Sequence, residues 1–590
     1  MIRNLLKYVK QYKRDSLLTP MFMVFEVVME LLIPLVTASI IDDGIEAGNM
    51  RHIYIYGALM LVMAMCSLFF GMMGGKYAAS ASSGFACNLR EAMFENIQKF
   101  SFSNIDKFST AGLVTRLTTD VTNIQNAYQM ILRMCIRSPL MLIFAVIMCL
   151  YLNVRLSMIF LVAIAFLGVC LFAIIIITMK IFDETFKKYD DLNASVQENI
   201  SAIRVVKAFV REGKETQKFT EASGNLYRMF VKAESNLALN GPIMMISVYG
   251  CILALSWFGA HFIVEGTFTT GDLTAMFSYV LNIMMSLMML SMIFVMVTLS
   301  VASARRINAV LTEVSDLQDP EDPIYAVPNG SIDFNHVSFS YQHEGKGKDT
   351  LSDIDVHIQS GETIGIVGGT GCGKSSFVSL ISRLYDVSAG SVCVGGNDVR
   401  AYDMEMLRNQ VAVVLQKNEL FSGTILDNLR WGNEDATEEE CIEACRQACA
   451  DEFIEQFPNG YHTFIERGGA NVSGGQKQRL CIARALLKKP KVLILDDSTS
   501  AVDTATDAKI RHAFATQIPG TTKLIIAQRI SSVQDADRIL VLEDGHVDAF
   551  DTHENLLQYN AIYQEMYESQ MKGGGDFDRP QAEGGANECQ

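Results

Sequence analysis

The chain has 590 residues and a formal net charge of −16, and apolar residues make up 50% of it while charged residues make up 19%. A chain of this length exceeds one compact domain, so two or more are expected. The apolar share is high for a soluble protein and predicts membrane-spanning segments. The acidity argues against nucleic acid as a partner. The 13 cysteines form no dense extracellular cluster, which predicts reduced thiols and not a disulfide framework.

Six apolar segments in the first 310 residues are long enough to cross a bilayer, whose hydrocarbon core of about 30 Å needs roughly 20 helical residues. A buried core helix is the alternative for any single segment. Six in succession, several of them without internal charge, instead predict a polytopic α-helical membrane domain over residues 1–310. The expected spans cover about residues 16–41, 54–80, 134–153, 156–180, 242–264 and 272–300.

Lysine and arginine residues set the expected orientation, because cytosolic loops carry an excess of them. They gather in the N-terminal segment and in residues 84–133 and 181–239, whereas the other connections are short and nearly free of positive charge. The N-terminus is therefore expected in the cytosol. Both long segments lack proline and have apolar residues at helical spacing, so they predict membrane helices that continue roughly 30 Å beyond the bilayer.

The C-terminal half has a different pattern, which predicts an α/β domain. Proline and acidic residues gather at residues 311–330, where helical periodicity stops, so this segment is expected to be a linker. Short β-rich runs then alternate with helical stretches over residues 331–570 and predict a largely parallel sheet. Residues 571–590 are glycine-rich and polar and predict a disordered tail.

A phosphate-binding loop is predicted at residues 368–375, GGTGCGKS, which follow the strand-like run ETIGIV and open a helical run. The spacing fits the pattern G-x-x-x-x-G-K-[ST] in its strand–loop–helix context. The glycines let backbone N–H groups turn toward phosphate oxygens, and the helix start adds partial positive charge. Lys374 would reach the β- and γ-phosphates, and Ser375 would ligate Mg²⁺. The expected nucleotide-binding set comprises Gly368, Gly369, Thr370, Gly371, Cys372, Gly373, Lys374, Ser375 and Ser376.

Two further residues of this half carry specific expectations. Cys372 stands beside Lys374 and a helix start, which both favour a thiolate, so it is either a reactive thiol that nucleotide protects or an inert small residue. Asp496 ends the strand-like run KVLILD and would hold Mg²⁺ through the water shell of the ion.

The phosphate loop, the strand that ends in Asp496, and the sequence VSGGQ at residues 472–476 occur together on one domain, after six apolar segments. This combination resembles ABC transporters, and the chain is similar to a half-transporter of the exporter fold over about residues 1–570. The resemblance implies ATP and Mg²⁺ as ligands and an ATPase that drives translocation. It also implies a site shared by two chains, in which the phosphate loop of one faces the signature loop of the other.

The motifs of the family assign roles to further residues of this chain. Tyr341 matches the aromatic residue that stacks on adenine, and Gln416 matches the glutamine that contacts Mg²⁺ and the membrane domain. Glu466 matches an acidic residue near the cytosolic turns. The signature loop, which would clamp the γ-phosphate bound to the opposite subunit, comprises Ser473, Gly474, Gly475 and Gln476.

Three segments match parts of the family that join domains. Residues 500–503, SAVD, match the loop that crosses the dimer interface. Residues 105–117 and 203–215 resemble the sequences around the two cytosolic turns that dock on the ATPase domains.

Two positions depart from the family pattern. Asp497 stands where the family usually has a glutamate that polarises the attacking water, and Gln528 stands where it has a histidine that bridges this water and the γ-phosphate. The shorter carboxylate retreats by about 1–1.5 Å, and a displacement near 1 Å can cost about 10²-fold in rate. Gln528 carries no positive charge, and losing a well-placed acid–base group costs about 10²–10⁴-fold. Hydrolysis at this chain's own phosphate loop should be very slow, whereas ATP binding should survive.

This pattern resembles heterodimeric bacterial multidrug exporters. A homodimer would hold two impaired sites, whereas a heterodimer would add a competent site built from the partner's Walker-B glutamate and switch histidine and from Ser473 of this chain. We expect one half of a heterodimeric exporter of amphipathic, drug-like or lipid-like hydrophobic compounds, multi-pass in a bacterial cytoplasmic membrane. An importer of metal chelates on the same fold is one alternative, and a nucleotide-gated channel or regulatory subunit is another.

Two acidic residues, Glu26 and Glu30, stand four positions apart in the first expected span and so share a helix face. Charge inside a membrane is costly and usually faces a cavity or a partner. The two glutamates are either a site that attracts cationic substrates, or partners of basic groups such as Arg133 or Arg137, or a water-facing wall without a substrate role. The sixth span is rich in methionine, which suits either a promiscuous apolar surface or plain helix packing.

Overall fold

The computed structural model of the chain describes residues 1–341, 349–497 and 504–573. The predicted interface loop at residues 500–503 and the part of the predicted tail beyond residue 573 lie outside the described residues.

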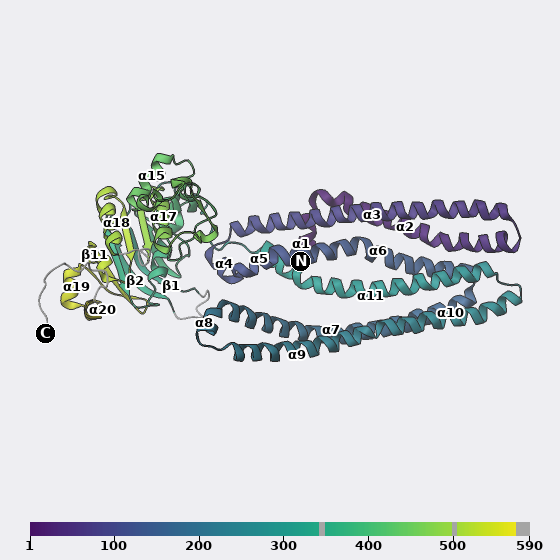
Figure 1. Ribbon diagram of the computed structural model, residues 1–590. Helices are drawn as coiled ribbons and strands as arrows, with labels where there is room; N and C mark the ends of the chain where they lie inside the picture. The colour runs from purple at the N-terminus through teal and green to yellow at the C-terminus, as the bar shows by residue number, and fades with distance from the viewer. Residues whose placement is uncertain (342–348, 498–503, 574–590) are drawn as a thin grey trace. The chain divides into compact units, whose positions relative to one another are not determined.

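The chain divides into two compact units. Unit 1 comprises Met1–Lys99 and Phe108–Glu313, and unit 2 comprises Phe100–Lys107 and the chain from Val314 onward. In Figure 1, unit 1 is a bundle of long helices, and unit 2 contains β-sheets covered by shorter helices.

Unit 1 is helical, and six of its stretches within the described residues are long and apolar enough to cross a membrane. This confirms the expected polytopic α-helical membrane domain. The stretches are Ile2–Glu46, Met50–Gln98, Thr110–Leu152, Val154–Ile181, Glu212–Val264 and Thr270–Thr312. Most of them are much longer than the roughly 20 residues that cross a bilayer, so they extend past its hydrocarbon core.

Side-chain caps begin three of the long helices. Asn49 accepts a hydrogen bond from a backbone N–H at the start of α3, Asn153 does so for α7, and Thr269 for α11. Such caps satisfy N–H groups that a helix start leaves free. The α-helices of unit 1 are α1 (Ile2–Leu6), α2 (Lys13–Ser39), α3 (Met50–Gln98), α5 (Thr110–Thr115), α6 (Val121–Leu152), α7 (Val154–Ser201), α8 (Ile203–Ala208), α9 (Glu212–Ala238), α10 (Asn240–Val264) and α11 (Thr270–Thr312), and short 3-10 or π-helical segments form η1 (Lys7–Tyr12), η2 (Ile40–Glu46) and η3 (Arg116–Asp120).

Helices α2, α3, α6 and α11 pack along one another in the core of unit 1. Tyr279 on α11 is fully buried, and its hydroxyl donates to the Leu31 carbonyl oxygen of α2 at 2.7 Å. Next to the start of α6, the buried carboxylate of Asp120 accepts hydrogen bonds from Ser303 and Arg306 of α11. Because each of these polar groups is paired, its burial ties helices together instead of weakening the core.

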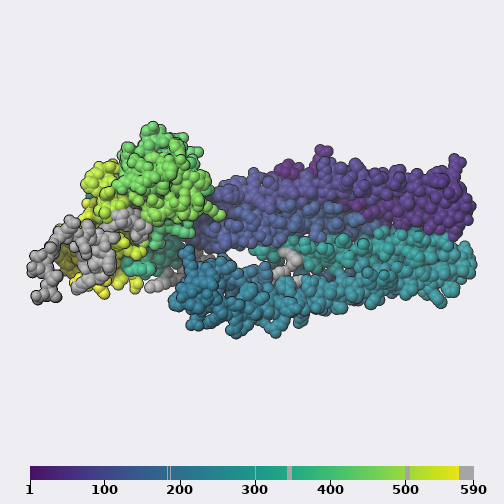
Figure 2. Space-filling view, in the orientation of Figure 1, coloured from purple at the N-terminus to yellow at the C-terminus, as the bar shows by residue number. Residues whose placement is uncertain are grey.

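Helices α7 and α9, joined by the short α8, form an arm of unit 1, and α9 packs chiefly on α7. In Figure 2, open space separates part of this arm from the rest of the unit. The α8 end of the arm exposes several apolar side chains, namely Ile200, Val205, Phe209 and Val210. Exposed apolar surface that is gathered in one place usually marks an interaction site.

The main sheet of unit 2 has six strands in the order β12-β11-β3-β10-β9-β6, and every pairing except β11–β12 is parallel. This confirms the expected α/β domain with a largely parallel sheet. Its strands are β3 (Thr363–Gly368), β6 (Val411–Val414), β9 (Val492–Asp496), β10 (Thr522–Ile526), β11 (Arg538–Glu543) and β12 (His546–Asp551). Parallel strands end at one edge of a sheet, so β3, β9 and β10 bring the residues that follow them together.

A second, antiparallel sheet has the order β2-β1-β4-β5, and β7 pairs with β8 alone. These strands are β1 (Ile332–Phe339), β2 (Leu351–Ile358), β4 (Ala389–Val394), β5 (Asn397–Asp398), β7 (Gly423–Thr424) and β8 (Phe464–Ile465). The α-helices from α12 onward are α12 (Lys374–Ile381), α13 (Met404–Gln410), α14 (Ile425–Leu429), α15 (Glu438–Gln447), α16 (Asp451–Ile454), α17 (Gly474–Leu486), α18 (Thr504–Gln517), α19 (His553–Tyr559) and α20 (Ala561–Gly573).

The segment Phe100–Lys107, which contains most of α4 (Phe102–Phe108), belongs to unit 2 although unit 1 flanks it in sequence. Within unit 2, the Tyr385 hydroxyl donates to Asp106 Oδ2 at 2.8 Å. The first predicted docking turn, residues 105–117, thus begins in a segment that packs on unit 2. Residues 203–215 lie in unit 1, and their docking stays a prediction.

The expected linker, residues 311–330, starts within the last turn of α11, which ends at Thr312. From Val314 onward it belongs to unit 2. The Ile324 N–H donates to the Ala401 carbonyl oxygen at 2.9 Å, so this part of the linker is fixed on the surface of unit 2.

Candidate active site

A glycine-rich loop joins the end of β3 at Gly368 to the start of α12 at Lys374. Gly371 and Gly373 have φ angles of 84° and 99°, in the left-handed region that favours glycine. A Cβ added to Gly369 or Gly371 would meet nothing within 4 Å, so open space faces both residues. The loop therefore offers an anion open space beside backbone N–H groups and a helix N-terminus.

The Lys374 side chain folds back over this loop. Its Nζ donates to the carbonyl oxygens of Gly368 and Gly369 at 2.9 and 2.8 Å, and it lies 3.7 Å from Cys372 Sγ. Cys372 is 5% exposed. A phosphate would compete well for the ammonium, because hydrogen bonds between two charged groups are stronger than those to a neutral carbonyl.

A hydroxyl and a carboxylate meet where β9 ends. Ser375 Oγ donates to Asp496 Oδ1 at 3.2 Å. Burial raises the pKa of the Asp496 carboxyl above its ordinary value, and the hydrogen bond from Ser375 partly offsets this rise. A buried carboxylate of this kind gains more than an exposed one from a cation placed next to it.

Asp497 and the two glutamines singled out in the sequence meet at one carboxylate oxygen. Asp497 Oδ2 accepts a hydrogen bond from Gln528 Nε2 at 2.8 Å and a longer one from Gln416 Nε2 at 3.4 Å. Asp497 is 8% exposed, and its φ of 48° lies in the left-handed region that non-glycine residues rarely adopt. Such backbone strain gathers at functional sites. The two departures from the family pattern are therefore bonded to each other.

Helix α20 binds the backbone of the loop that contains Gln528. Gln570 Nε2 donates to the Gln528 carbonyl oxygen at 2.9 Å, and the Ile530 N–H donates to Gln570 Oε1 at 2.8 Å. Sequence reasoning missed Gln570, because an amide that binds backbone groups on a distant loop belongs to no motif.

Tyr341 is half exposed next to the phosphate loop. Its hydroxyl shares a hydrogen bond with Ser376 Oγ at 2.9 Å. Its ring packs edge to face on Phe339 and Tyr385, with centroid distances of 4.8 and 5.1 Å. An exposed aromatic ring in this place can stack on a purine. Tyr385, which sequence reasoning also missed, connects this ring to Asp106.

The predicted signature loop forms the start of α17. Ser473 Oγ accepts from the Gln476 N–H at 3.3 Å, and the Ser473 N–H donates to Gln476 Oε1 at 2.9 Å. This reciprocal cap leaves the hydroxyl proton of Ser473 and the N–H groups of Gly474 and Gly475 to bind an anion. Ser473 and Gly474 are exposed, as is Glu466 earlier in the chain. Pairing with a second chain stays a prediction.

The two glutamates of α2 have different surroundings. Arg137 Nη2 donates to both carboxylate oxygens of Glu30 at 2.7 and 2.8 Å, whereas Arg137 Nε lies 3.8 Å from Glu26 Oε1. Glu30 and Arg137 line a cavity of about 440 Å³ between α2, α6 and α11. Glu26 instead lies against Gly71 of α3. One of the three sequence alternatives, pairing with a basic group, is present, and a substrate role stays a prediction.

Two family models match the chain. The model described as the ABC transporter transmembrane region matches residues 17–288, and the model described as ABC transporter matches residues 351–500.

Two relatives in sequence and one solved structure cover most of the chain. The uncharacterized ABC transporter ATP-binding protein YfiB of Bacillus subtilis (strain 168) is 37% identical over 570 residues, which is 97% of this chain and 99% of YfiB. The ATP-dependent lipid A-core flippase of Desulfotalea psychrophila (strain LSv54 / DSM 12343) is 33% identical over 489 residues, 82% of this chain and 84% of the flippase. A bacterial Atm1-family ABC exporter solved with ATP bound shares the fold, with a TM-score of 0.81 and 23% identity over 94% of this chain and 98% of that one.

Proposed function

The chain belongs to the ABC transporters, as an exporter-type half-transporter with fused transmembrane and ATP-binding domains, and from this premise we propose that it is the hydrolysis-impaired half of a heterodimeric exporter. It is a multi-pass membrane protein, and its ATP-binding domain is an ATPase whose turnover is coupled to transport. The proposal adds that turnover takes place mainly at the site completed by the partner.

The hydrogen bond between Gln528 and Asp497 carries this proposal. A carboxylate that accepts from two amides has fewer lone pairs left for the water that attacks the γ-phosphate. Gln528 also stays neutral when hydrolysis requires positive charge. Losing one such group costs about 10²–10⁴-fold in rate. ATP binding relies on Lys374, Ser375 and the loop backbone, so this chain would hold ATP without splitting it.

Mg²⁺ fits the residues present. The Ser375 hydroxyl, the Asp496 carboxylate and the Gln416 side-chain oxygen are the hard oxygen ligands that this ion prefers. Two of them already face each other, since Ser375 Oγ lies 3.2 Å from Asp496 Oδ1. When bound, the ion neutralises charge on the β- and γ-phosphates.

The α7–α9 arm supports a second half-transporter as partner. Its exposed apolar end, with Phe209 72% and Val210 79% exposed, has no cover in the described part of this chain. A partner's ATP-binding domain would bury it. We propose that the partner carries the Walker-B glutamate and the switch histidine and that this chain supplies Ser473 to that competent site.

The cavity between α2, α6 and α11 supports an amphipathic cargo. Met285 and Met289 give it adaptable apolar surface, and the Glu30–Arg137 pair gives it a polar side. The name of the flippase relative adds a lipid-like candidate. The proposed attraction of cationic substrates depends on the carboxylates of Glu26 and Glu30 together. Replacing both by Gln should then weaken transport of cationic compounds more than of neutral ones.

Transport by the reconstituted heterodimer tests the proposal. The partner is identified by mass spectrometry of the protein that co-purifies with this chain. In inside-out vesicles, the pair should accumulate a fluorescent amphipathic dye when ATP is added. Substituting the partner's Walker-B glutamate by Gln should stop accumulation, whereas Asp497→Asn in this chain should change it little. A homodimer with brisk ATPase would contradict the proposal, and uptake in the opposite direction would indicate an importer.

A further inference from the structure

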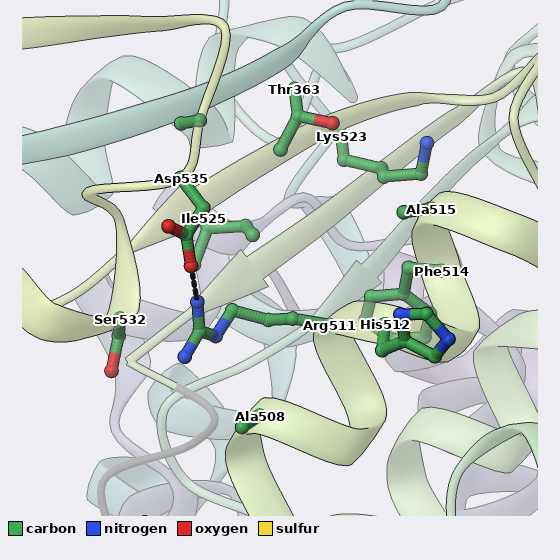
Figure 3. Close-up of a pocket in the computed structure, with 11 residues that line it drawn as sticks. Thr363, Ala508, Arg511, His512, Phe514, Ala515, Lys523, Ile525, Ser532 and Asp535 are labelled. Carbon is green, nitrogen blue, oxygen red and sulfur yellow. Dashed lines mark hydrogen bonds and ion pairs between the residues drawn. The ribbon is translucent and has the colours of Figure 1, made fainter. Parts of the chain in front are cut away.

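A second cavity, of about 270 Å³, lies in unit 2 between α18 and the main sheet. Its lining residues, most of them labelled in Figure 3, belong to β3, β10, α18, η7 (Ile530–Ser532) and the loop that follows η7. Thr363 and Lys523 line it from the amino-terminal ends of their strands. The phosphate loop and Asp496 stand at the carboxyl ends of β3 and β9. The cavity therefore lies toward the other edge of the sheet, and none of its lining residues belongs to the predicted nucleotide site.

Lys523 is the unusual residue in this cavity. Strand β10 lies between β3 and β9, and such central parallel strands are normally apolar throughout. Lys523 and Ile525 share one face of β10 and both line the cavity. The residue Lys523 is only 3% exposed, its side chain borders the cavity, and within the described residues no hydrogen bond or ion pair joins its ammonium to another side chain. Buried charges ordinarily have one.

Electrostatics agree with this geometry. Burial lowers the pKa of Lys523, and the carboxylate of Asp537 nearby offsets only part of this effect. The charged form of the lysine is thus short of stabilising neighbours.

The other strong cation of the wall is already balanced. Arg511 Nη1 donates to Asp535 Oδ2 at 2.7 Å, and its Nε donates to Asp507 Oδ2 at 3.3 Å. Asp507 is 4% exposed and also accepts from the Ser532 hydroxyl. This network fixes Arg511 in place, and Figure 3 shows its bond to Asp535. Lys523, and not Arg511, is therefore the cation of this wall that is available to pair with a ligand.

Besides the charged residues, the wall has three polar residues, Thr363, His512 and Ser532, and its remaining residues are apolar. Phe514 and Ile525 are almost fully buried and line the cavity together with Ala508, Ala515 and Ala536. The volume is near the lower end of the range for small-molecule sites.

We propose that this cavity binds a small monocarboxylate with an apolar body. The carboxylate accepts hydrogen bonds from the Lys523 ammonium, and the body packs against Phe514 and Ile525. A phosphate dianion fits less well, because the carboxylate of Asp535 in the wall would repel its second charge. The site is separate from the ATP site, so this proposal does not depend on the proposed function.

Titration of the full chain in detergent micelles with benzoate, followed by calorimetry, tests the proposal. We expect saturable binding and a rise of Tm with benzoate concentration. Lys523→Met should weaken binding by about tenfold or more, since it removes a charge-assisted hydrogen bond. Asp535→Asn should tighten it a few-fold, because it removes a negative charge from the wall and leaves Arg511 paired with Asp507 alone.

Two more variants test whether benzoate binds in this cavity and not elsewhere. Lys509→Met removes an exposed lysine of α18 that pairs with Glu452, and it should leave the Kd unchanged. Ala515→Leu fills the cavity from an exposed position on α18 and should abolish binding, even if Lys523→Met does not fold. Absence of saturable benzoate binding, binding that survives Ala515→Leu, or binding of inorganic phosphate in preference to benzoate would each overturn the proposal.

Discussion

If the site is impaired as we propose, the carboxylate of Asp497 joins the two substituted positions. Gln528 reaches it at 2.8 Å and Gln416 at 3.4 Å, so the amide that replaces the histidine also occupies the carboxylate that replaces the glutamate. Effects of residues that act as a unit do not multiply. The combined loss of rate should therefore resemble the larger of the two single losses.

Protection of the Cys372 thiol by nucleotide stays a prediction, and so does the alternative of an inert small residue. The thiol lies under the loop, with Lys374 Nζ 3.7 Å away. Bound ATP would draw the ammonium toward its phosphates and cover the loop. Alkylation of Cys372 by N-ethylmaleimide, followed by mass spectrometry, should slow about tenfold when ATP is present at ten times its Kd, because only the empty fraction reacts. Exposed Cys87 on α3 is the internal control. Equal rates with and without ATP would leave Cys372 as an inert small residue.

For single residues, the sequence predicted which residues form the motifs but not which side chains they bind by hydrogen bonds. The glycines of the phosphate loop, Lys374 and the cap of α17 have fixed local spacings. The contact between Asp497 and Gln528 spans 31 positions and depends on the register of β9 against β10. The sequence shows Lys523 as a charged residue within an apolar strand. That its ammonium lacks a hydrogen-bond partner among the described residues depends on the packed fold.

Among the elements, α20 supports the loop that follows β10. Gln570→Ala removes two hydrogen bonds to this loop, each worth about 0.5–1.5 kcal/mol. Hydrogen exchange of the Ile530 amide should then be about tenfold faster. Gln564→Ala, on the same helix but bonded to the Leu557 carbonyl oxygen, should leave that amide unchanged. Unchanged exchange in both variants would show that α20 does not brace the loop.

Tyr385 connects the adenine side of the site to the segment that contains Asp106. Burial, together with Asp106, raises the pKa of Tyr385, so it stays a neutral donor at every physiological pH. Tyr385→Phe keeps the ring against Tyr341 but loses the bond to Asp106. We expect an unchanged Kd for ATP and a few-fold lower ratio of transport to ATP hydrolysis, since a hydrogen bond to a charged group is worth about 1.5–3 kcal/mol.

The matched control is Tyr559→Phe, which alters an exposed tyrosine whose hydroxyl lies 3.5 Å from Asp551. It should leave both quantities unchanged. A normal ratio in Tyr385→Phe would mean that Asp106 transmits nothing through this bond.

The sequence predicted the types of the helices and strands better than the residues at which they end. Apolar length predicted six spans, and alternating runs predicted the parallel sheet. The ends differ because helices such as α3 continue without a break from apolar into polar sequence. Helix propensity does not change at a membrane surface, so hydropathy marks the lipid boundary and not the helix end.

For the whole molecule, the sequence indicated two domains and a partner, but not which surfaces stay uncovered. The exposed Phe209 and Val210 became visible only once α9 was seen to pack chiefly on α7. The same holds for the segment Phe100–Lys107, whose place in unit 2 depends on contacts far apart in sequence.

The most direct test of the account follows photo-crosslinkable, radiolabelled ATP in the heterodimer. After one turnover period, nucleotide attached near Tyr341 of this chain is analysed and compared with nucleotide attached to the partner. We predict triphosphate on this chain and diphosphate on the partner, and Asp497→Glu combined with Gln528→His should speed cleavage on this chain by about 10²-fold or more. Diphosphate that accumulates on both chains at the same rate would contradict the account.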